Sequence, residues 1–141
     1  MATVNFFIGG TATGSKNIWK MQDDGTDITI LYSALTAAGE IVRALVKDID
    51  GNLYVGTSNG KVYKYTDSGS ALSLDTSWAT AGIYTVAASN EVHALSVDIN
   101  KFLAIAHTKS GTEHCALLNA SGAEQWDADT GSNSNTCEAA A

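Results

Sequence analysis

Short runs of β-prone residues, separated by glycine-containing turn signals, recur along the chain. The clearest group covers residues 42–50, 53–57, 61–65 and 70–74. Valine, tyrosine, leucine and threonine fill these runs, and such residues favour strands. Gly51, Gly60 and Gly69 stand between the runs, where glycine supplies the positive φ that tight turns need. The pattern predicts a meander of four short antiparallel strands.

The same order of runs returns fifty residues later. Residues 92–100 repeat residues 42–50, and the repeat continues with residues 102–108, 113–118 and 123–127, with Gly111 and Gly122 in its turns. Upstream, the second, third and fourth runs are matched by residues 5–11, 17–21 and 27–31, with Gly25 in a turn. A self-similar four-strand unit with a period near fifty residues is typical of β-propeller blades. We therefore expect an all-β fold of about three four-stranded antiparallel propeller blades.

The predicted units follow one another within a single domain. The first, partial unit covers residues 5–35, the second residues 40–78 and the third residues 90–129. Only residues 32–38 could form a helical turn, which Gly39 would end. The chain has no proline, which suits hydrogen-bonded strands because proline removes a ladder donor.

The first and last units are incomplete in a complementary way. The first begins at its second strand, and the tail 136–141 carries Glu138 where Glu40 and Glu91 stand before an innermost strand. We therefore expect this tail to pair with the head strand of another chain, through Glu138, Ala139 and Ala140 on one side and Asn5, Phe6, Phe7 and Ile8 on the other. Propellers usually have about 4–8 blades, so the ring would be completed by oligomerisation, most simply as a head-to-tail dimer. A longer open stack, or docking onto a different protein, is the main alternative.

Two segments resemble the blades of known propellers. Residues 50–63, Asp-Gly-Asn-Leu-Tyr-Val-Gly-Thr-Ser-Asn-Gly-Lys-Val-Tyr, resemble the blade motif of two-component-regulator and quinoprotein-like (PQQ-type) propellers. Residues 117–126, Leu-Leu-Asn-Ala-Ser-Gly-Ala-Glu-Gln-Trp, resemble the quinoprotein-type ending, whose tryptophan docks against the neighbouring blade. The resemblance implies that Trp126 packs between blades. The first two units depart from the motif, with Thr29 and Ser73 at the corresponding position.

Large aromatic residues and glycines are the structural residues that the repeat predicts. We expect blade packing from Trp19, Tyr54, Tyr63 and Trp126. We expect structural turns or tight strand packing at Gly25, Gly51, Gly56, Gly60, Gly69, Gly111 and Gly122.

Composition and charge narrow the classes of partner. Charged residues make up 16% of the chain, against roughly 25% in an average globular domain, so we expect much of the surface to be covered by other protein. The net charge of −7 and the eight scattered lysines and arginines disfavour nucleic-acid binding. No apolar run approaches the length of a transmembrane helix, and the first residues lack a basic signal-peptide region. We expect no membrane partner and a protein that is cytoplasmic when made, with a virus particle as one destination.

No residue pattern points to a catalytic, cofactor-binding or metal site. Asp48 and Asp50 precede a glycine, as in calcium loops, but the remaining EF-hand ligands are missing. His93, His107 and His114 have spacings unlike zinc motifs, so we expect ordinary strand residues. Cys115 and Cys137 are too few for a disulfide framework.

The leading functional hypothesis is therefore a non-enzymatic, self-assembling propeller without a cofactor. It would be a structural or docking component of a larger assembly, such as a phage particle. The alternatives are a carbohydrate-binding propeller lectin and a fragment of a quinoprotein-like enzyme.

Overall fold

The computed structural model describes residues 3–13, 16–86 and 90–130, and within them it contains twelve β-strands and no helix. The strands are β1 (Val4–Thr13), β2 (Lys16–Asp23), β3 (Ile28–Ala34), β4 (Val42–Lys47), β5 (Leu53–Thr57), β6 (Lys61–Asp67), β7 (Leu72–Leu74), β8 (Ile83–Thr85), β9 (Val92–Val97), β10 (Leu103–Lys109), β11 (Thr112–Leu118) and β12 (Glu124–Asp129). The all-β prediction is confirmed.

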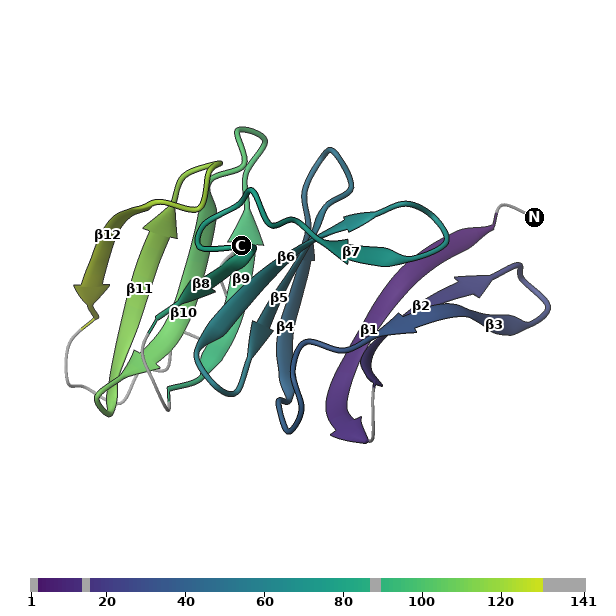
Figure 1. The fold of residues 1–141 in the computed structure, drawn as a ribbon, viewed down its shortest axis with the longest axis horizontal. Coiled ribbons are helices and arrows are strands. Elements are labelled where there is room, and N and C mark those ends of the chain that lie inside the picture. The colour runs from purple at the N-terminus through teal and green to yellow at the C-terminus, as the bar shows by residue number, and fades with distance from the viewer. Residues whose placement is uncertain (1–2, 14–15, 87–89, 131–141) are drawn as a thin grey trace.

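The strands form three antiparallel sheets, in which neighbouring strands follow chain order. Sheet 1 has the order β1-β2-β3, sheet 2 has β4-β5-β6-β7 with β8 also paired to β6, and sheet 3 has β9-β10-β11-β12. The sheets stand side by side along the long axis of the molecule, with sheet 2 in the middle (Figure 1). None of them closes on itself within the described residues.

The first hairpin of sheet 2 (β4–β5) and the first hairpin of sheet 3 (β9–β10) have the same type of turn. The Asp48 carboxylate accepts a hydrogen bond from the backbone N–H of Asn52 at 2.8 Å, and Asp98 accepts one from Phe102 at 2.7 Å. Each side chain therefore caps its own turn, as Asp does in such loops. Asp48 is accordingly a turn residue.

Residues 32–34 are extended and complete β3, so the weak helical alternative at residues 32–38 is not formed there. Two details of the predicted secondary structure are wrong. Residues 48–50 and 98–100 belong to turns, so β4 and β9 are shorter than expected. The second unit also continues past residue 78, because β8 pairs with β6 at Lys61–Tyr63, beyond the part that β7 occupies.

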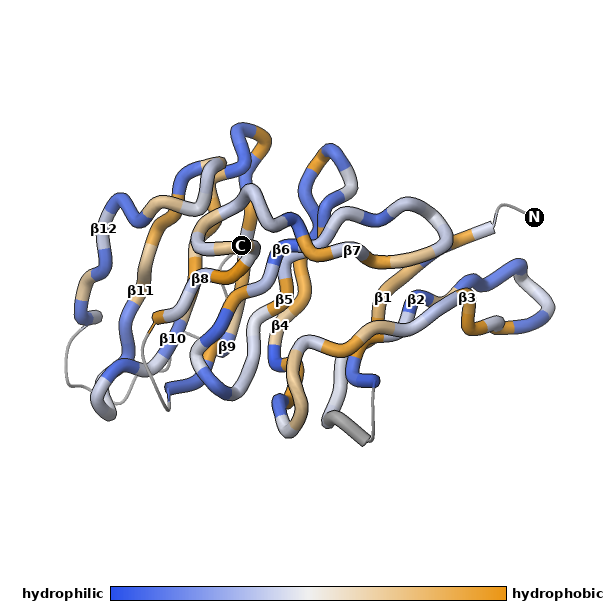
Figure 2. The backbone as a smooth tube through the Cα atoms, in the orientation of Figure 1, coloured by the Kyte–Doolittle hydropathy of each residue, from blue (hydrophilic) through white to orange (hydrophobic). Residues whose placement is uncertain are grey.

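Two apolar layers hold the sheets together. One lies between sheets 1 and 2 and has as its buried members Ile18, Val42, Leu53, Val55, Tyr63 and Tyr65. The other lies between sheets 2 and 3 and is built from Tyr54, Val62, Trp78, Val92, Leu95, Leu103, Ile105, Ala116 and Leu118. Sheet 2 is therefore buried on both faces, and Figure 2 shows the apolar parts of β4 and β5 in the middle of the molecule. This arrangement explains why successive residues of β5 are all apolar or small rather than alternating.

The same close approach joins each sheet to the next. A Cβ atom placed on Gly9 of β1 would lie 2.1 Å from Val42 Cγ1 of β4. A Cβ atom placed on Gly56 of β5 would lie 2.5 Å from Val92 Cγ1 of β9. Only glycine fits at either place, because real Cβ contacts are longer than this. The first strand of sheet 2 (β4) and the first strand of sheet 3 (β9) therefore pack against equivalent glycines of the preceding sheet.

Candidate functional site

Each sheet carries an equivalent set of four residues on one face. The cross-strand pairs are Phe6–Met21 and Ile8–Trp19 in sheet 1, Leu53–Tyr65 and Val55–Tyr63 in sheet 2, and Leu103–Leu118 and Ile105–Ala116 in sheet 3. In sheets 2 and 3 all of these residues are buried, because the preceding sheet packs over them. In sheet 1 the set is less buried: Ile8 is 44% exposed, and Phe6, Trp19 and Met21 are only partly buried.

This partly exposed face of sheet 1 extends onto β3. Ile30 is the register partner of Met21, and Ile28 is the partner of Asp23. The exposed fractions are 57% for Ile30, 58% for Ile28 and 57% for Val4. We call Val4, Phe6, Ile8, Trp19, Met21, Ile28 and Ile30 the head face. Asp23 lies between Val4 and Ile28 on the same face, so the apolar residues surround one carboxylate. A cluster of exposed apolar residues of this kind marks an interaction surface.

The residues predicted to pair between chains lie partly on this face. Phe6 and Ile8 point away from sheet 2, whereas Phe7 alternates with them and packs into the layer between sheets 1 and 2. Asn5 also belongs to β1, which is the edge strand of sheet 1. The partner residues Glu138, Ala139 and Ala140 lie outside the described residues, so the tail pairing stays a prediction.

The four aromatic residues predicted for blade packing fall into two groups. Tyr54 is buried between sheets 2 and 3, at 5.5 Å from the ring centroid of Trp78, and Tyr63 is buried between sheets 1 and 2. Trp19 lies on the head face, opposite Ile8. Trp126 is 47% exposed on the far face of sheet 3, so it does not pack between two sheets of one chain. Its contact with a blade of a second chain stays a prediction.

The turn glycines lie where the repeat predicts them. Gly25, Gly51, Gly60, Gly69, Gly111 and Gly122 all have positive φ, between 68° and 89°. Gly56 instead sits within β5 under Val92.

A buried ion pair links sheet 1 to sheet 2. Lys20 Nζ lies 2.7 Å from the Asp67 carboxylate, and the Tyr32 hydroxyl donates to the other oxygen of the same group. Burial opposes ionisation of Asp67, but Lys20 and Tyr32 together hold the pKa of this carboxyl below its usual value. Burial beside Asp67 also raises the pKa of Tyr32 well above the normal phenol value. The network therefore ties sheet 1 to sheet 2 through side chains of β2, β3 and β6.

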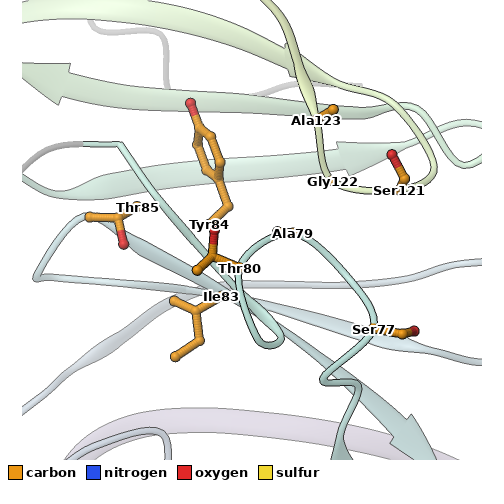
Figure 3. Close-up of a pocket in the computed structure, with 9 residues that line it drawn as sticks. All are labelled: Ser77, Ala79, Thr80, Ile83, Tyr84, Thr85, Ser121, Gly122 and Ala123. Atoms are coloured by element: carbon orange, nitrogen blue, oxygen red, sulfur yellow. The ribbon is translucent and has the colours of Figure 1, made fainter.

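A cavity of about 720 Å³ lies between β8 and the turn that precedes β12. It is lined by Ser77, Ala79, Thr80, Ile83, Tyr84, Thr85, Ser121, Gly122 and Ala123 (Figure 3). The backbone N–H of Ala79 donates to the Ser121 carbonyl at 2.8 Å and closes one side. Hydroxyl groups dominate the lining, and none of these nine residues carries a charge. Such a cavity suits a neutral, hydroxyl-rich ligand better than an ion.

Two of the three histidines come together in sheet 3 with an aspartate. His107 and His114 are register partners on β10 and β11, and their rings stack at a centroid distance of 5.5 Å. Asp127 Oδ1 lies 2.9 Å from His114 Nδ1 and 3.4 Å from His107 Nε2. Burial lowers the pKa of His107 and so favours its neutral ring, although Asp127 opposes this shift. His93, the third histidine, instead contacts Thr108 and Glu113.

This cluster was not predicted from the sequence, although part of its signal is present in the chain. The two-residue turn Ser110-Gly111 sets residues equidistant from it opposite each other, and His107 and His114 are such a pair. Asp127 gives no comparable signal, because the register of β11 and β12 shifts between Leu117 and Leu118.

The fold contains no helix, among the residues described, that is long and apolar enough to cross a membrane. No protein-family model and no curated protein matches the chain.

Proposed function

We propose that the protein is a non-enzymatic, self-assembling β-propeller that serves as a structural or docking component of a larger assembly, such as a phage particle. Its three sheets would be three blades of a ring that a second copy completes. The observation that carries the proposal is the head face. It repeats, residue for residue in register, the faces of sheets 2 and 3 that the preceding sheet covers.

The opposite end of the array supplies a matching surface. Ala104 and Leu117 are register partners on the far face of sheet 3, and Trp126 is the next partner in the row. Small and apolar side chains here, where Tyr54 and Lys64 stand in sheet 2, leave room for the large residues of a head face. Head-to-tail stacking would bring the two surfaces together and, if the rotation closes, would form a ring.

The mass of the protein in solution tests this proposal. Light scattering coupled to size exclusion should give twice the chain mass for a closed pair, and larger species for an open stack. Ile8→Asp and Ile30→Asp place a charge on the head face and should release monomers with an unchanged far-ultraviolet spectrum. Ile99→Asp is the matched control, because Ile99 is 72% exposed in the turn after β9 and lies outside the head face. A monodisperse monomer at all concentrations, or an oligomer that Ile8→Asp leaves intact, would contradict the proposal.

A carbohydrate-binding lectin is the second candidate, and the cavity between β8 and sheet 3 favours it. The hydroxyl groups of Ser77, Thr80, Thr85 and Ser121 and the ring of Tyr84 are groups that sugars commonly meet. A glycan array, followed by Thr80→Val and Ser121→Ala, tests this function. Specific binding that both substitutions weaken would support the lectin, and the absence of any bound glycan would exclude it for the sugars tested.

A further inference from the structure

We propose that His107, His114 and Asp127 form a binding site for a divalent transition metal of the zinc class. The site is independent of the proposed assembly, since all three residues belong to sheet 3 of one chain. Their candidate ligand atoms all lie within 4.8 Å of one another. A tetrahedral zinc ion with bonds of about 2.0–2.2 Å separates its ligands by a little over 3 Å, so small side-chain rotations suffice to enclose the ion.

The strand pairing holds the three side chains on one face. His107 and His114 are cross-strand partners, and the neighbouring pair on that face is formed by Ala116 and Asp127. Because residues i and i+2 share a face, His114 and Ala116 point the same way. Asp127 is the cross-strand partner of Ala116, so it lies on this face as well. The site therefore stands on three hydrogen-bonded strands, and strands hold ligands in place more rigidly than loops.

His107 supplies a second observation that points to a ligand. Its side chain is fully buried, and among the described residues neither ring nitrogen makes a well-formed hydrogen bond, although Nε2 has Asp127 Oδ1 nearby at 3.4 Å. A buried polar group that lacks a good hydrogen bond is costly, and native proteins rarely keep one without a reason. Coordination of a metal through Nε2, which faces Asp127 at 3.4 Å, would satisfy this nitrogen.

The two oxygens of Asp127 have different partners. Oδ1 faces both histidines, while Oδ2 accepts a charge-assisted hydrogen bond from Lys109 Nζ. Ligating carboxylates are usually held in this way by a hydrogen bond to the oxygen that does not bind the metal. Lys109 would thus orient Asp127 and leave Oδ1 for the ion.

The donor set narrows the choice of metal. Two imidazoles and one carboxylate suit Zn²⁺, Co²⁺ or Ni²⁺, whereas Ca²⁺ and Mg²⁺ prefer oxygen ligands alone. Three protein ligands leave a fourth position for water or for a group from a partner.

Calorimetric titration of the untagged full chain with ZnCl₂ tests the site, with Co²⁺ absorption as a second readout. We expect one equivalent of Zn²⁺ to bind, and a d–d spectrum of tetrahedral intensity with Co²⁺. His114→Asn and Asp127→Asn should each weaken Zn²⁺ binding by at least 10–100-fold. His114 is partly exposed, so its variant is expected to fold, and a thermal melt without metal checks this.

His93→Asn is the matched control, because His93 lies on the adjacent strand β9 but outside the cluster. It should bind Zn²⁺ as the native chain does. The proposal is overturned if the native chain shows no saturable Zn²⁺ binding. It is equally overturned if folded His114→Asn and Asp127→Asn retain native affinity, or if His93→Asn loses as much affinity as they do.

Discussion

Gly56 of β5 lies directly against Val92 of β9, so that a single added methyl group would approach the valine side chain to 2.5 Å. Gly9 and Val42 repeat this relation between sheets 1 and 2. Leu45 and Leu95 flank the two contacts at the same distance, 3.4 Å from the position that a methyl group would take on each glycine. The internal repeat of the sequence is therefore also a repeat of the contact that joins one sheet to the next.

Two adjacent glycines in β1 provide a direct test of this contact. Gly9→Ala should lower the free energy of unfolding by about 1–3 kcal/mol, because the new methyl group overlaps Val42. Gly10→Ala should be neutral or slightly stabilising, because a methyl group there meets only Trp19 at 3.5 Å. Urea denaturation measures both values. Equal losses for the two variants would mean that packing against Val42 does not set the choice of glycine.

The buried pair between Lys20 and Asp67 should contribute strongly to stability. Lys20→Met leaves the Asp67 carboxylate without its cation, and breaking one partner of a buried pair typically costs about 3–5 kcal/mol. Glu91→Gln is the control, because both side chains of the Arg43–Glu91 pair are exposed to solvent. This pair should contribute less than about 1 kcal/mol to the free energy of unfolding. Chemical denaturation at pH 7 compares them. A similar small loss in both variants would contradict the structural role of Lys20.

The same carboxylate predicts a dependence of stability on pH. The pKa of Asp67 is lower in the folded protein than in the unfolded chain, so its stabilising contribution is complete above the unfolded pKa of about 3.9. The contribution is lost as the pH falls through the folded value. The difference in stability between the native chain and Asp67→Asn should therefore be constant from pH 7 to about pH 5 and narrow below pH 4. A difference that does not change down to pH 2 would count against this ionisation.

Trp78 and Trp126 should respond differently to truncation. Trp78 is 2% exposed and packs on Tyr54 and next to Gly122, so Trp78→Ala should cost about 3–5 kcal/mol. Trp126→Ala should cost much less in an isolated chain and should weaken self-association instead. Thermal melts and light scattering separate the two effects. If Trp126→Ala destabilises the dilute monomer as much as Trp78→Ala does, the far face of sheet 3 is not an assembly surface.

The turn before β6 should discriminate between side chains by shape. Gly60 has φ of 68°, and its carbonyl accepts a hydrogen bond from Val86 at 2.8 Å. Gly60→Val should cost on the order of 1–2 kcal/mol, because a β-branched residue is strained in this conformation. Gly60→Asn is the conservative partner and should cost less, since asparagine tolerates the left-handed region. Calorimetric melting temperatures in the order Gly, Asn, Val are expected, and an unchanged melt for Gly60→Val would refute the assignment.

Much of the secondary structure follows from local pattern, whereas the contacts between distant strands do not. The strand from Leu53 to Thr57 agrees in both bounds with its expectation, because a glycine-containing turn stands at each end. β8 was missed because it has only three residues and follows the turn that seats Trp78 between sheets 2 and 3. Asp127 could not be assigned to the histidine cluster, because a shift of register in β11–β12 decides which face it occupies. The packing of Trp126 between blades was predicted from the resemblance alone. The resemblance does not say whether another sheet of the same chain lies against Trp126.

The position held by Gly56 in sheet 2 is held by Ala106 in sheet 3, at the same place in the register. If residues 42–91 were duplicated in tandem within the gene, Gly56 of the first copy would meet Val42 of the second, as Gly9 meets it now. A tandem copy of the third unit would instead set an alanine methyl group against a valine. At this contact, therefore, a copy of the middle unit would bring no new steric conflict, whereas a copy of the third unit would.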